Sequence, residues 1–437
     1  MSTQRHQHAI VIGGSMAGLL AARVLSEQFE RVTIVDRDQL PFTAEPRRGV
    51  PQSVQPHVLF SKGYQILEEL FPGIGETLAA RGAVAFDWGK DFLYFQKGNW
   101  APTTEAAIGL KSYTCTRPLL ESTVRQRVSS LPNVEFLQNQ RVIGLWGNAT
   151  SIQGIKLQQG SLSAQLVVDA SGRSTHLPEW LQDLGLTPPP MTVVDPGLGY
   201  ATRRYRIPAE AQPNAKIVLI SQEAPNQPRL GYLAQVEADQ WIATLGGYGR
   251  DYPPIDDRDF LQFAQSLSDP LFYEAIVHAE PLSEIQAHRA TVNRLYHYEK
   301  IKLPDGLVAI GDAVCALCPI YGQGMTVSAM SSLVLRRWLQ QSRNSTFNGM
   351  SFQKQLAQSN AFPWSIATSS DSKFPTTKGA IPPTWAGKLF QAYGDRLAVR
   401  AQNDVDLHLQ FLQIGHMLKS PSLLFHPRLM LKALLSV

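Results

Sequence analysis

The sequence is poor in cysteine, and its ten histidines show no spacing typical of metal ligands. Three cysteines among 437 residues are too few for a disulfide framework. Cys315 and Cys318 form a single C-x-x-C, which without a second pair of ligands is a weak zinc signature. We expect no metal site and expect these cysteines to pack in the interior, with redox chemistry by the pair as the alternative.

Long apolar runs, a leader pattern and a strong charge imbalance are also absent. No window reaches the length of a bilayer-spanning helix, and MSTQRHQHAIVIGG passes directly into a strand pattern without the apolar core of a secretory signal. The net charge of +4, from 40 basic and 36 acidic residues, is too mild to indicate nucleic-acid binding. We therefore expect a soluble, cytoplasmic protein.

The chain is longer than a single core usually is, so two domains are expected. At its start, HAIVIGG predicts a strand, AGLLAARVLSEQF a helix, and RVTIVDRD a second strand that ends in an acid. Further helices are predicted near 62–71, from residue 117 and at 257–267. Residues 133–164 alternate like a small antiparallel layer before a buried strand, and 197–250 predict an antiparallel meander in a separate sheet.

GGSMAG, residues 13–18, follows the first strand and nearly matches a dinucleotide-binding fingerprint. Gly13 permits the tight turn, Gly18 allows close helix packing, and the helix start directs amides at a pyrophosphate. Ser15 replaces the middle glycine and is small enough to keep that approach. About twenty residues on, Asp36 is placed to accept hydrogen bonds from a ribose. The segment predicts dinucleotide binding, and the alternative is a tight strand–helix turn without a ligand.

A second glycine-rich segment, GLVAIGDAVCALCPIYGQGM, begins as an apolar strand that ends at Gly311 and Asp312. The Asp312 carboxylate can accept from sugar-like hydroxyls. Pro319 and the run Gly322-Gln323-Gly324 form a loop that opens a helix, whose amides can stabilise negative charge on a ring system. An ordinary turn with a capping aspartate is the alternative.

Together GGSMAG, LVVDASGRST and GDAVCALCPIYGQGM resemble, in order and spacing, the three FAD-contacting segments of the flavoprotein monooxygenases with the aromatic-hydroxylase fold (group A). The resemblance spans about residues 8–345. It implies an α/β fold with a Rossmann-like FAD-binding domain, an inserted antiparallel-sheet substrate domain and a C-terminal helical tail. The implied parts are an FAD-binding domain (1–75, 104–185 and 295–345), a substrate-binding domain (76–103 and 186–294) and a mostly helical region (346–437).

The resemblance also implies residue roles. The first loop would bind the ADP half of FAD, Asp312 the ribityl chain, and the loop at 319–325 the pyrimidine end of the isoalloxazine. PRRGVPQ is similar to a segment of epoxidase-like members that approaches the flavin. Arg117 matches a family arginine near the ribose and phosphates. The implied FAD contacts are Gly13, Ser15, Met16, Ala17, Gly18, Asp36, Arg37, Arg47, Arg48, Gln52, Arg117, Asp169, Ser171, Gly172, Gly311, Asp312, Pro319, Gly322, Gln323, Gly324 and Met325.

Departures from the aromatic hydroxylases direct the resemblance towards the polyether- and squalene-type epoxidases. Where hydroxylases carry adjacent Asp-Gly, this chain has Ser171-Gly172, with Asp169 two residues earlier. DASG is shared with epoxidases, geranylgeranyl reductases and flavin halogenases. The halogenases carry W-x-W-x-I-P, which this sequence lacks, and FPWSIA at 362–367 is its nearest segment. Geranylgeranyl reductases generally lack the arginine-rich RRGVPQ.

The family chemistry implied is insertion of one oxygen atom from O2, through a flavin C4a-hydroperoxide, into an apolar substrate. Phenol hydroxylation profits from a base, whereas an alkene needs none, and the sequence offers no compelling base. We therefore favour epoxidation of an olefinic or aromatic secondary metabolite over hydroxylation. A flavin-dependent reductase, cyclase or halogenase, or a non-catalytic flavin sensor, are the alternatives. No second fingerprint occurs, so NADPH or NADH would bind transiently.

Two surfaces remain for the substrate and for partners. The sheet at 197–250, with the aromatic residues Tyr200, Tyr205, Tyr232, Trp241 and Tyr248, is expected to wall an apolar pocket, and His57 is the one histidine expected beside it. The tail LHLQFLQIGHMLKSPSLLFHPRLMLKALLSV mixes apolar and basic residues. It is expected either to pack on the protein or to make a peripheral membrane contact. The oligomeric state is left open.

Overall fold

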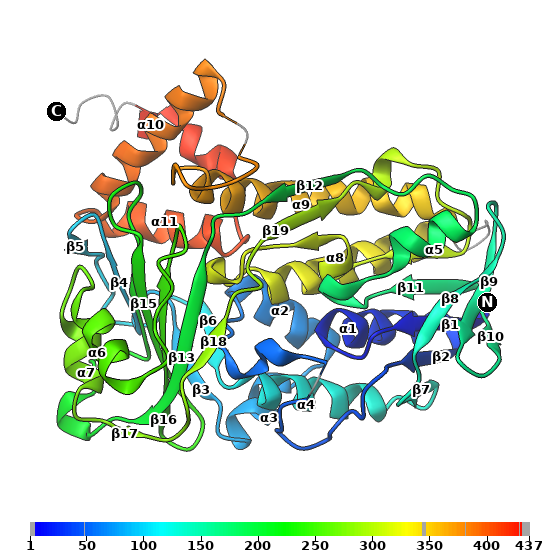
Figure 1. Cartoon of the computed structure of the whole chain (residues 1–437), viewed down its shortest axis with the longest axis horizontal. Coiled ribbons are helices and arrows are strands. Elements are labelled where there is room, and N and C mark those ends of the chain that lie inside the picture. Colours follow the sequence, from blue (N-terminus) through cyan, green and yellow to red (C-terminus); the bar gives the residue numbers. More distant parts are fainter. Residues whose placement is uncertain (1–4, 48, 343–346, 381, 428, 431–437) are drawn as a thin grey trace.

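The apolar runs near residues 10, 32, 167 and 308 are adjacent strands of one parallel sheet in the computed structural model, which describes residues 5–47, 49–342, 347–380, 382–427 and 429–430 (Figure 1). The inner residues of these strands are almost fully buried in one core, to which helices and a small antiparallel layer both contribute. The sheet has the order β20 (Leu307–Ala309), β11 (Leu166–Asp169), β1 (His6–Ile12), β2 (Phe29–Val35) and β7 (Val134–Leu137).

Helices α1, α4 and α8 pack around this sheet. The first, α1 (Met16–Leu25), is buried along almost its whole length and contacts β2, α4 (Arg117–Ser129) and α8 (Gly324–Gln341). The predicted βαβ unit is present as β1, α1 and β2, whose strands pair in parallel from His6 with Phe29 to Ile12 with Val35. The remaining helices of this region are α2 (Ser61–Leu70), α3 (Ile74–Ala80), α5 (Leu177–Asp183) and α9 (Gly349–Asp371).

One expectation for residues 133–164 is wrong. The segment NVEFL forms β7, which pairs in parallel with β2 and so extends the central sheet. The antiparallel layer contains only the later strands, β8 (Val142–Gly147), β9 (Ile152–Leu157) and β10 (Ser161–Ser163). A period-two pattern gives the exposed face of a strand but not its partner, so the assignment could not be made from alternation alone.

A second, largely antiparallel sheet lies beside the first (Figure 1). The predicted meander is only partly correct, because the strand at Gly199–Arg206 lies beyond the last strand of the run. At the other edge, the strand at Phe92–Gln96 pairs in parallel with the strand at Ile217–Ile220. The order is β17 (Glu280–Pro281), β13 (Gly199–Arg206), β16 (Gln240–Gly247), β15 (Arg229–Val236), β14 (Ile217–Ile220), β4 (Phe92–Gln96) and β5 (Asn99–Trp100), and β18 (Gln286–His288) pairs with β13.

The two faces of this second sheet bury different side chains. One face, with Tyr205, Trp241 and Leu245, packs in a core with residues of α6 (Asp257–Gln265) and α7 (Leu271–Ile276). The opposite face, with Tyr94 and Tyr232, looks towards the first sheet and contributes to a cavity. Smaller pairings connect the sheets, namely β3 (Val84–Asp87) with β6 (Lys111–Thr114), and β12 (Met191–Val194) with β19 (Asn293–Tyr296) and β21 (Cys315–Ala316).

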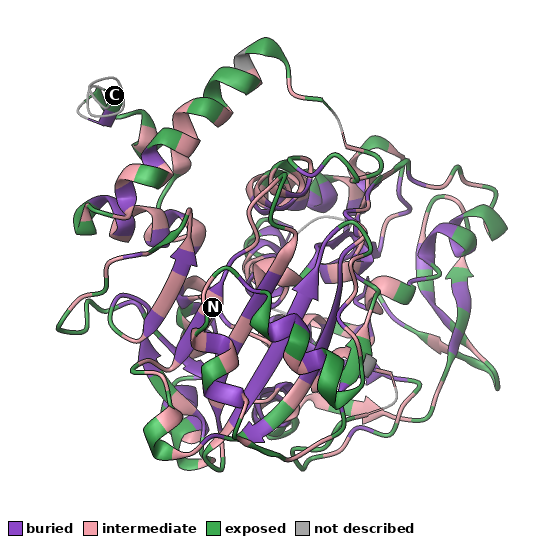
Figure 2. Ribbon diagram, turned by 60° about the vertical axis from the view of Figure 1, so that its left-hand side comes forward, coloured by how far each residue is buried: buried purple, intermediate pink, exposed green. Residues whose placement is uncertain are grey.

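The C-terminal part is helical, as predicted. After α9, helices α10 (Trp385–Ala401) and α11 (Val405–Gly415) form a pair beside the second sheet, and α11 packs Leu412 into a cluster with Phe92 and Trp88 (Figure 1). The outer side of α10 is exposed (Figure 2). Within the described part of the chain, no helix is both long and apolar enough to cross a membrane.

The turn between β1 and α1 depends on two glycines that lie against each other. Gly13 has a φ of +103°, and a Cβ at Gly18 would lie 1.8 Å from the carbonyl oxygen of Gly13. The predicted close packing is therefore present as backbone against backbone.

We expect Gly18→Ala to lower the free energy of unfolding by at least about 2 kcal/mol, because neither backbone segment can move without disrupting the sheet. Urea denaturation measures the change. The control is Gly394→Ala in α10, where an added Cβ meets no atom within 4 Å. A helical Gly→Ala substitution in open space should be neutral or slightly stabilising. Equal losses in both variants would contradict the steric argument.

Candidate active site

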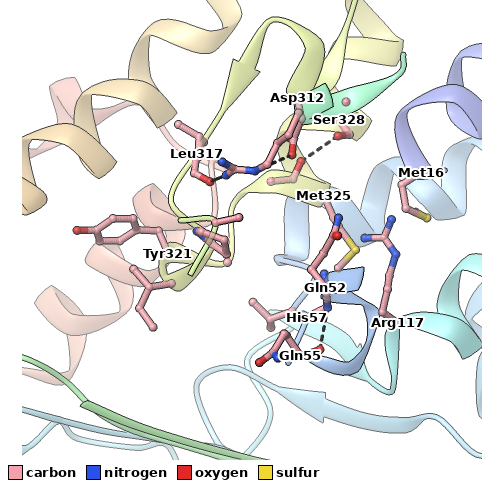
Figure 3. A pocket seen from close by; sticks show the side chains of 18 of the residues that line it. Met16, Gln52, Gln55, His57, Arg117, Asp312, Leu317, Tyr321, Met325 and Ser328 are labelled. Atoms are coloured by element: carbon pink, nitrogen blue, oxygen red, sulfur yellow. Dashed lines mark hydrogen bonds and ion pairs between the residues drawn. The ribbon is translucent and has the colours of Figure 1, made fainter. Parts of the chain in front are cut away.

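A continuous cavity of about 890 Å³ lies between the two sheets. Residues after the carboxyl ends of four parallel strands line it: Gly13–Ala17 after β1, Asp36 and Arg37 after β2, Ala170–Ser174 after β11, and Asp312 after β20. Ligands of open parallel sheets bind at this edge. Figure 3 shows Met16, Arg117, Asp312 and Met325, which come from distant parts of the chain, around the same space.

The start of α1 presents backbone amides to the cavity. Ser15 is the N-cap residue, yet its side chain makes no capping hydrogen bond. The first amides of a helix have no partner within the helix, and they carry partial positive charge. Since Ser15, Met16 and Ala17 line the cavity, this helix start provides an anion-binding site of the type that holds a pyrophosphate.

The Ser15 hydroxyl instead belongs to a buried ionic network around Glu121, which the sequence analysis did not identify. Ser15 Oγ donates to Glu121 Oε2 over 2.8 Å and accepts from Arg117 Nη2 over 2.8 Å. Arg47 Nε and Arg125 Nη2 reach Glu121 Oε1 over 3.1 and 2.5 Å. Burial alone would raise the pKa of Glu121, but the three guanidinium groups outweigh it and lower the pKa to about 2.

Asp36 lies at the end of β2, as predicted, and is already tied to its surroundings. Its Oδ2 accepts from the Gly14 amide over 2.6 Å, and Oδ1 accepts from the Asp38 amide over 2.8 Å. Arg47 Nη1 lies 2.7 Å from Asp38 Oδ2 and 3.6 Å from Asp36 Oδ1. These contacts fix the carboxylate at the cavity wall, where lone pairs remain for sugar hydroxyls.

At the middle motif, Ser171 and Gly172 line the cavity but Asp169 does not, contrary to expectation. The Asp169 side chain is fully buried beneath the turn. It accepts from the Ser171 amide over 3.0 Å, from the Ser171 hydroxyl over 2.6 Å and from the Thr175 hydroxyl over 2.5 Å. Asp169 thus holds the turn that presents Ser171, and burial raises its pKa.

Asp312 lines the cavity (Figure 3), and so does its neighbour Arg173, another residue that the sequence analysis missed. Arg173 Nε lies 3.6 Å from Asp312 Oδ2, and the same guanidinium donates to the carbonyl groups of Val292 and Leu317. Gly311 lies behind this point with a φ of +61°, where a Cβ would come within 2.7 Å of the Ala17 side chain. Because Gly311 has no side chain, the segment after β20 can contact the start of α1.

The loop at 319–325 follows a short helical turn (Pro319–Tyr321) and leads into α8. Gly322 has a φ of +65° and lies against Val58, where a Cβ would be 2.4 Å from Cγ1. Gln323 is the N-cap of α8 but makes no capping hydrogen bond, and its buried Oε1 has no hydrogen-bond partner among the described residues. The start of α8 therefore presents a second set of amides beside the cavity.

These features fit FAD. An added Cβ at Gly172 or Gly324 meets no atom within 4 Å, and both glycines line the cavity. The walls there offer an open backbone surface that a flat ring and a chain of hydroxyls can approach. Arginines and two uncapped helix starts form a donor set that matches a pyrophosphate and an isoalloxazine, and the Asp36 carboxylate can accept from a ribose.

A buried carboxylate holds the 319–325 loop from behind. Asp371, at the end of α9, is fully buried and accepts from Tyr321 over 2.5 Å, Tyr248 over 3.1 Å and Asn293 over 2.6 Å. Asn293 also accepts from the Cys318 amide over 2.7 Å. Burial raises the pKa of Asp371 to about 6, against the lowering effect of these donors.

The second sheet forms the rest of the wall, although only part of the expected aromatic set takes part. Tyr200, Tyr232 and His57 line the cavity. Trp241 does not, because Thr244 of the same strand faces the cavity and Trp241, three positions earlier, points to the α6 side. Tyr248 is also absent from the wall, since it lies behind Tyr321 in the Asp371 cluster.

Burial lowers the pKa values of three histidines at the cavity. Burial lowers the pKa of His57 to about 3, and its Nδ1 lies 2.9 Å from the Gln55 carbonyl oxygen (Figure 3). Burial also lowers the pKa of His416 to about 3 and lowers that of His288, which stacks on Tyr200. Imidazoles with such low pKa values are weak bases at neutral pH.

The structure thus brings most predicted contacts to one cavity. Those that line it are Gly13, Ser15, Met16, Ala17, Asp36, Arg37, Arg47, Gln52, Arg117, Ser171, Gly172, Asp312, Pro319, Gly322, Gly324 and Met325. Gly18, Asp169, Gly311 and Gln323 lie just behind the wall. Arg48 lies outside the described residues.

The cysteines are buried and unpaired. Cys115, Cys315 and Cys318 are free thiols, and burial raises the pKa of each. Thiols held in this form are poor nucleophiles. Among the described residues, no group of three potential His, Cys, Asp or Glu ligands could hold a metal ion.

Of the cavity residues and their neighbours that the sequence analysis missed, some have a recognisable spacing in the sequence and others do not. Glu121 lies four residues from both Arg117 and Arg125, a spacing that places the three side chains on one helix face. Trp88 and His416 line the cavity from segments with no recognisable motif.

Solved structures with the same architecture include flavin-dependent enzymes. The flavin-dependent brominase Bmp2 superposes with a TM-score of 0.68 at 15% identity, covering 94% of this chain and 93% of that one. PqsL of Pseudomonas aeruginosa, described as a probable FAD-dependent monooxygenase, gives a TM-score of 0.59 at 16% identity, covering 92% and 98%. The chain has the fold of the FAD-dependent monooxygenases and halogenases, as the sequence motifs predicted.

Sequence relatives identify the family. Protein Rv3254 of Mycobacterium tuberculosis is 31% identical over 433 residues, 94% of this chain and 90% of that protein. The chain belongs to the same family as Protein Rv3254. Squalene monooxygenase 1,1 of Brassica napus is 23% identical over 77% of this chain and 63% of its own length, in line with the predicted resemblance to squalene-type epoxidases. No protein-family profile matches the chain.

We expect Glu121→Gln to lower the free energy of unfolding by about 3 kcal/mol at neutral pH, because it leaves buried guanidinium groups without a counter-charge. The native pKa of about 2 lies below the ordinary value of 4.5. The stabilisation is therefore complete above about pH 4.5 and is lost as the pH falls towards about 2.

Urea denaturation at several pH values measures this effect. Glu135→Gln is the matched control, because that carboxylate pairs with Arg31 at the surface and its side chain is 52% exposed. Its loss should stay below about 1 kcal/mol. A pH-independent loss in Glu121→Gln would contradict the ionic explanation.

Proposed function

We propose that the protein is an FAD-dependent monooxygenase that inserts one oxygen atom of O2 into a largely apolar, olefinic or aromatic substrate, with epoxidation favoured over hydroxylation. The observation that supports this proposal is the continuity of the cavity. Its charged end carries the dinucleotide-binding features, and its other end is walled by apolar and neutral side chains.

The residues that would hold FAD follow from the geometry. The amides at the start of α1 and the guanidinium of Arg117 would bind the pyrophosphate, Asp36 the adenosine ribose, and Asp312 the ribityl hydroxyls. Bound and reduced FAD supplies the chemistry of oxygen activation. The protein's part is to position the substrate and to keep water away from the reacting atoms.

The preference for epoxidation rests on the low basicity of three histidines of the cavity wall. His57, His288 and His416 have lowered pKa values, and the carboxylate of Asp371 is fully buried behind Tyr321. Ionising a phenol would need a stronger proton acceptor in contact with the substrate. A carbon–carbon double bond is already a nucleophile and needs no such group.

A flavin-dependent reductase, cyclase or halogenase is the second candidate, favoured by the likeness to a brominase. The fold is common to both candidates. NADPH or NADH would reduce the flavin by transient contact. Oxygen insertion is distinguished by incubation with an olefin panel, an NAD(P)H source and air, with product masses read for one added oxygen. Halide-dependent products or reduction products without added oxygen would favour the second candidate.

We expect Asp312→Ala to weaken FAD retention about tenfold or more, because the ribityl hydroxyls would lose a charged acceptor. Flavin absorbance after gel filtration measures occupancy. Asp251→Ala is the control: that aspartate also forms an ion pair with an arginine, Arg229, but does not line the cavity. Full flavin occupancy in Asp312→Ala would remove this assignment.

We also propose a peripheral membrane contact, which the sequence led us to expect in the tail from residue 407, and we assign it to the preceding helix α10. Trp385, Leu389 and Val399 recur on its outer face and are 77%, 59% and 51% exposed. Lys388 and Arg396 are exposed on the same side and suit anionic headgroups. On its inner side, α10 contributes Asp395 and Ala398 to the cavity wall, so apolar molecules in a lipid surface would be close to the cavity.

We expect Leu389→Glu to reduce co-sedimentation with vesicles of phosphatidylglycerol and phosphatidylcholine several-fold, since it places a charge where acyl chains would lie. Ile255→Glu serves as the control, because Ile255 is 62% exposed at a distance along the chain from this helix. Equal binding of the two variants, or absence of binding by the unmodified protein, would count against membrane contact.

A further inference from the structure

His57 lies where the nucleotide end of the cavity meets its apolar end. The charge of Arg117 acts on the imidazole from the nucleotide side. Val58, the next residue, packs against the cluster of aromatic side chains that contains Trp88 and Phe92. His57 itself lines the cavity (Figure 3). Its ring is therefore placed beside a ligand that occupies the apolar end.

One hydrogen bond fixes which ring nitrogen of His57 carries the proton. Nδ1 lies 2.9 Å from the carbonyl oxygen of Gln55. A carbonyl oxygen can only accept, so Nδ1 carries the hydrogen and Nε2 carries a lone pair. Gln55 is itself held in place, because its side chain donates to the Gln286 carbonyl over 3.0 Å and accepts from the Thr202 hydroxyl over 2.5 Å. The imidazole thus has one tautomer, in which Nε2 is a hydrogen-bond acceptor.

The Nε2 atom of His57 is open to the cavity. No hydrogen bond joins it to another described residue, and it is not one of the fully buried side-chain atoms that lack a partner. The residue is half-buried, and burial is the main cause that lowers its pKa to about 3, so its exposed part faces the cavity and not the outer surface. The lone pair therefore reaches the space that a ligand would occupy.

The donor for this lone pair has to come from outside the cavity wall. Arg117, whose charge acts on the ring, is already bonded to Ser15 and Glu121. Water can donate to Nε2 while the cavity is free of ligand, but a ligand that fills the apolar end displaces it. A ligand without a donor would then leave the acceptor unsatisfied, which costs binding free energy. The imidazole is a weak base, so it accepts a hydrogen bond from a hydroxyl without taking its proton.

We propose that His57 Nε2 accepts a hydrogen bond from a hydroxyl or N–H group of the substrate, which makes His57 a specificity-determining residue. This inference rests on the proposed function and narrows its substrate class to apolar molecules that carry such a donor, for example an olefinic alcohol. Analogues in which the donor is blocked are discriminated against because they displace water from Nε2 without replacing its hydrogen bond.

Two alcohols and their methyl ethers test the proposal, because each pair differs in the presence of a donor. The alcohols are 2-naphthylmethanol, which has a flat ring system, and farnesol, which is a linear olefin. Equilibrium dialysis against the full chain, with the flavin content measured, gives the dissociation constants. We expect at least one alcohol to bind about fivefold more tightly than its ether.

His57→Phe keeps a flat ring but removes the acceptor. We expect it to weaken binding of the preferred alcohol about fivefold and to leave binding of its ether unchanged within about twofold. His57→Gln, whose amide oxygen can accept in place of Nε2, should keep most of the preference. The matched control is His408→Phe, since His408 is also buried and has a pKa lowered by burial but does not line the cavity. That variant should bind all four probes as the unmodified protein does.

His57→Leu provides the same comparison if His57→Phe does not fold. Equal losses for alcohol and ether, alcohols that bind no better than their ethers, or failure of both alcohols to bind would each overturn the proposal. A fall in flavin content without a change in the preference would assign the contact to the cofactor and would also overturn it. Because dialysis requires no turnover, a protein that prefers the alcohol through His57 but inserts no oxygen contradicts the proposed function and leaves the role of His57 intact.

Discussion

The cavity depends on one buried anion, Glu121. Its carboxylate joins Ser15 at the start of α1, Arg47 after β2, and Arg117 and Arg125 on α4, so three separate segments meet at one point. Guanidinium groups this close together would repel one another without it. The serine that interrupts the glycine fingerprint is thereby explained, since its hydroxyl links the nucleotide loop to the ionic network that lies beneath it.

Features that depend on local backbone geometry could be predicted from the sequence. Gly13, Gly18 and the helix start at Ser15 belong to a continuous strand–turn–helix unit, whose requirements are visible in a few residues. Arg117 was found because a family motif includes it. The roles of other residues depend on strand register and burial, which only the structure gives. Trp241 and Tyr232 are equally aromatic and lie on neighbouring strands, but opposite faces give them different roles, and no local signal distinguishes the two faces.

The two ends of the cavity divide its tasks by charge. Arginines, aspartates and uncapped helix starts surround the nucleotide end of the cavity. Aromatic side chains and neutral histidines line its other end. The loop at 319–325 lies between them and is fixed from behind by Asp371 and Asn293, both fully buried. A rigid loop at this junction allows a polar site and an apolar site to share one volume without the polar site drawing water into the apolar one.

The aromatic end of the cavity, lined by Trp88, Phe92 and His416, includes residues from the C-terminal part of the chain. Leu412 of α11 packs in the same cluster as Trp88 and Phe92. His416, which follows the last residue of α11, lines the cavity. A strand region and a C-terminal helix of independent sequence must therefore fit each other. Chimaeras that exchange only the last helices between relatives would change the shape of this aromatic end of the cavity while leaving the nucleotide end intact. The shape of this end of the cavity can consequently vary through the C-terminal helices without a change at the nucleotide end.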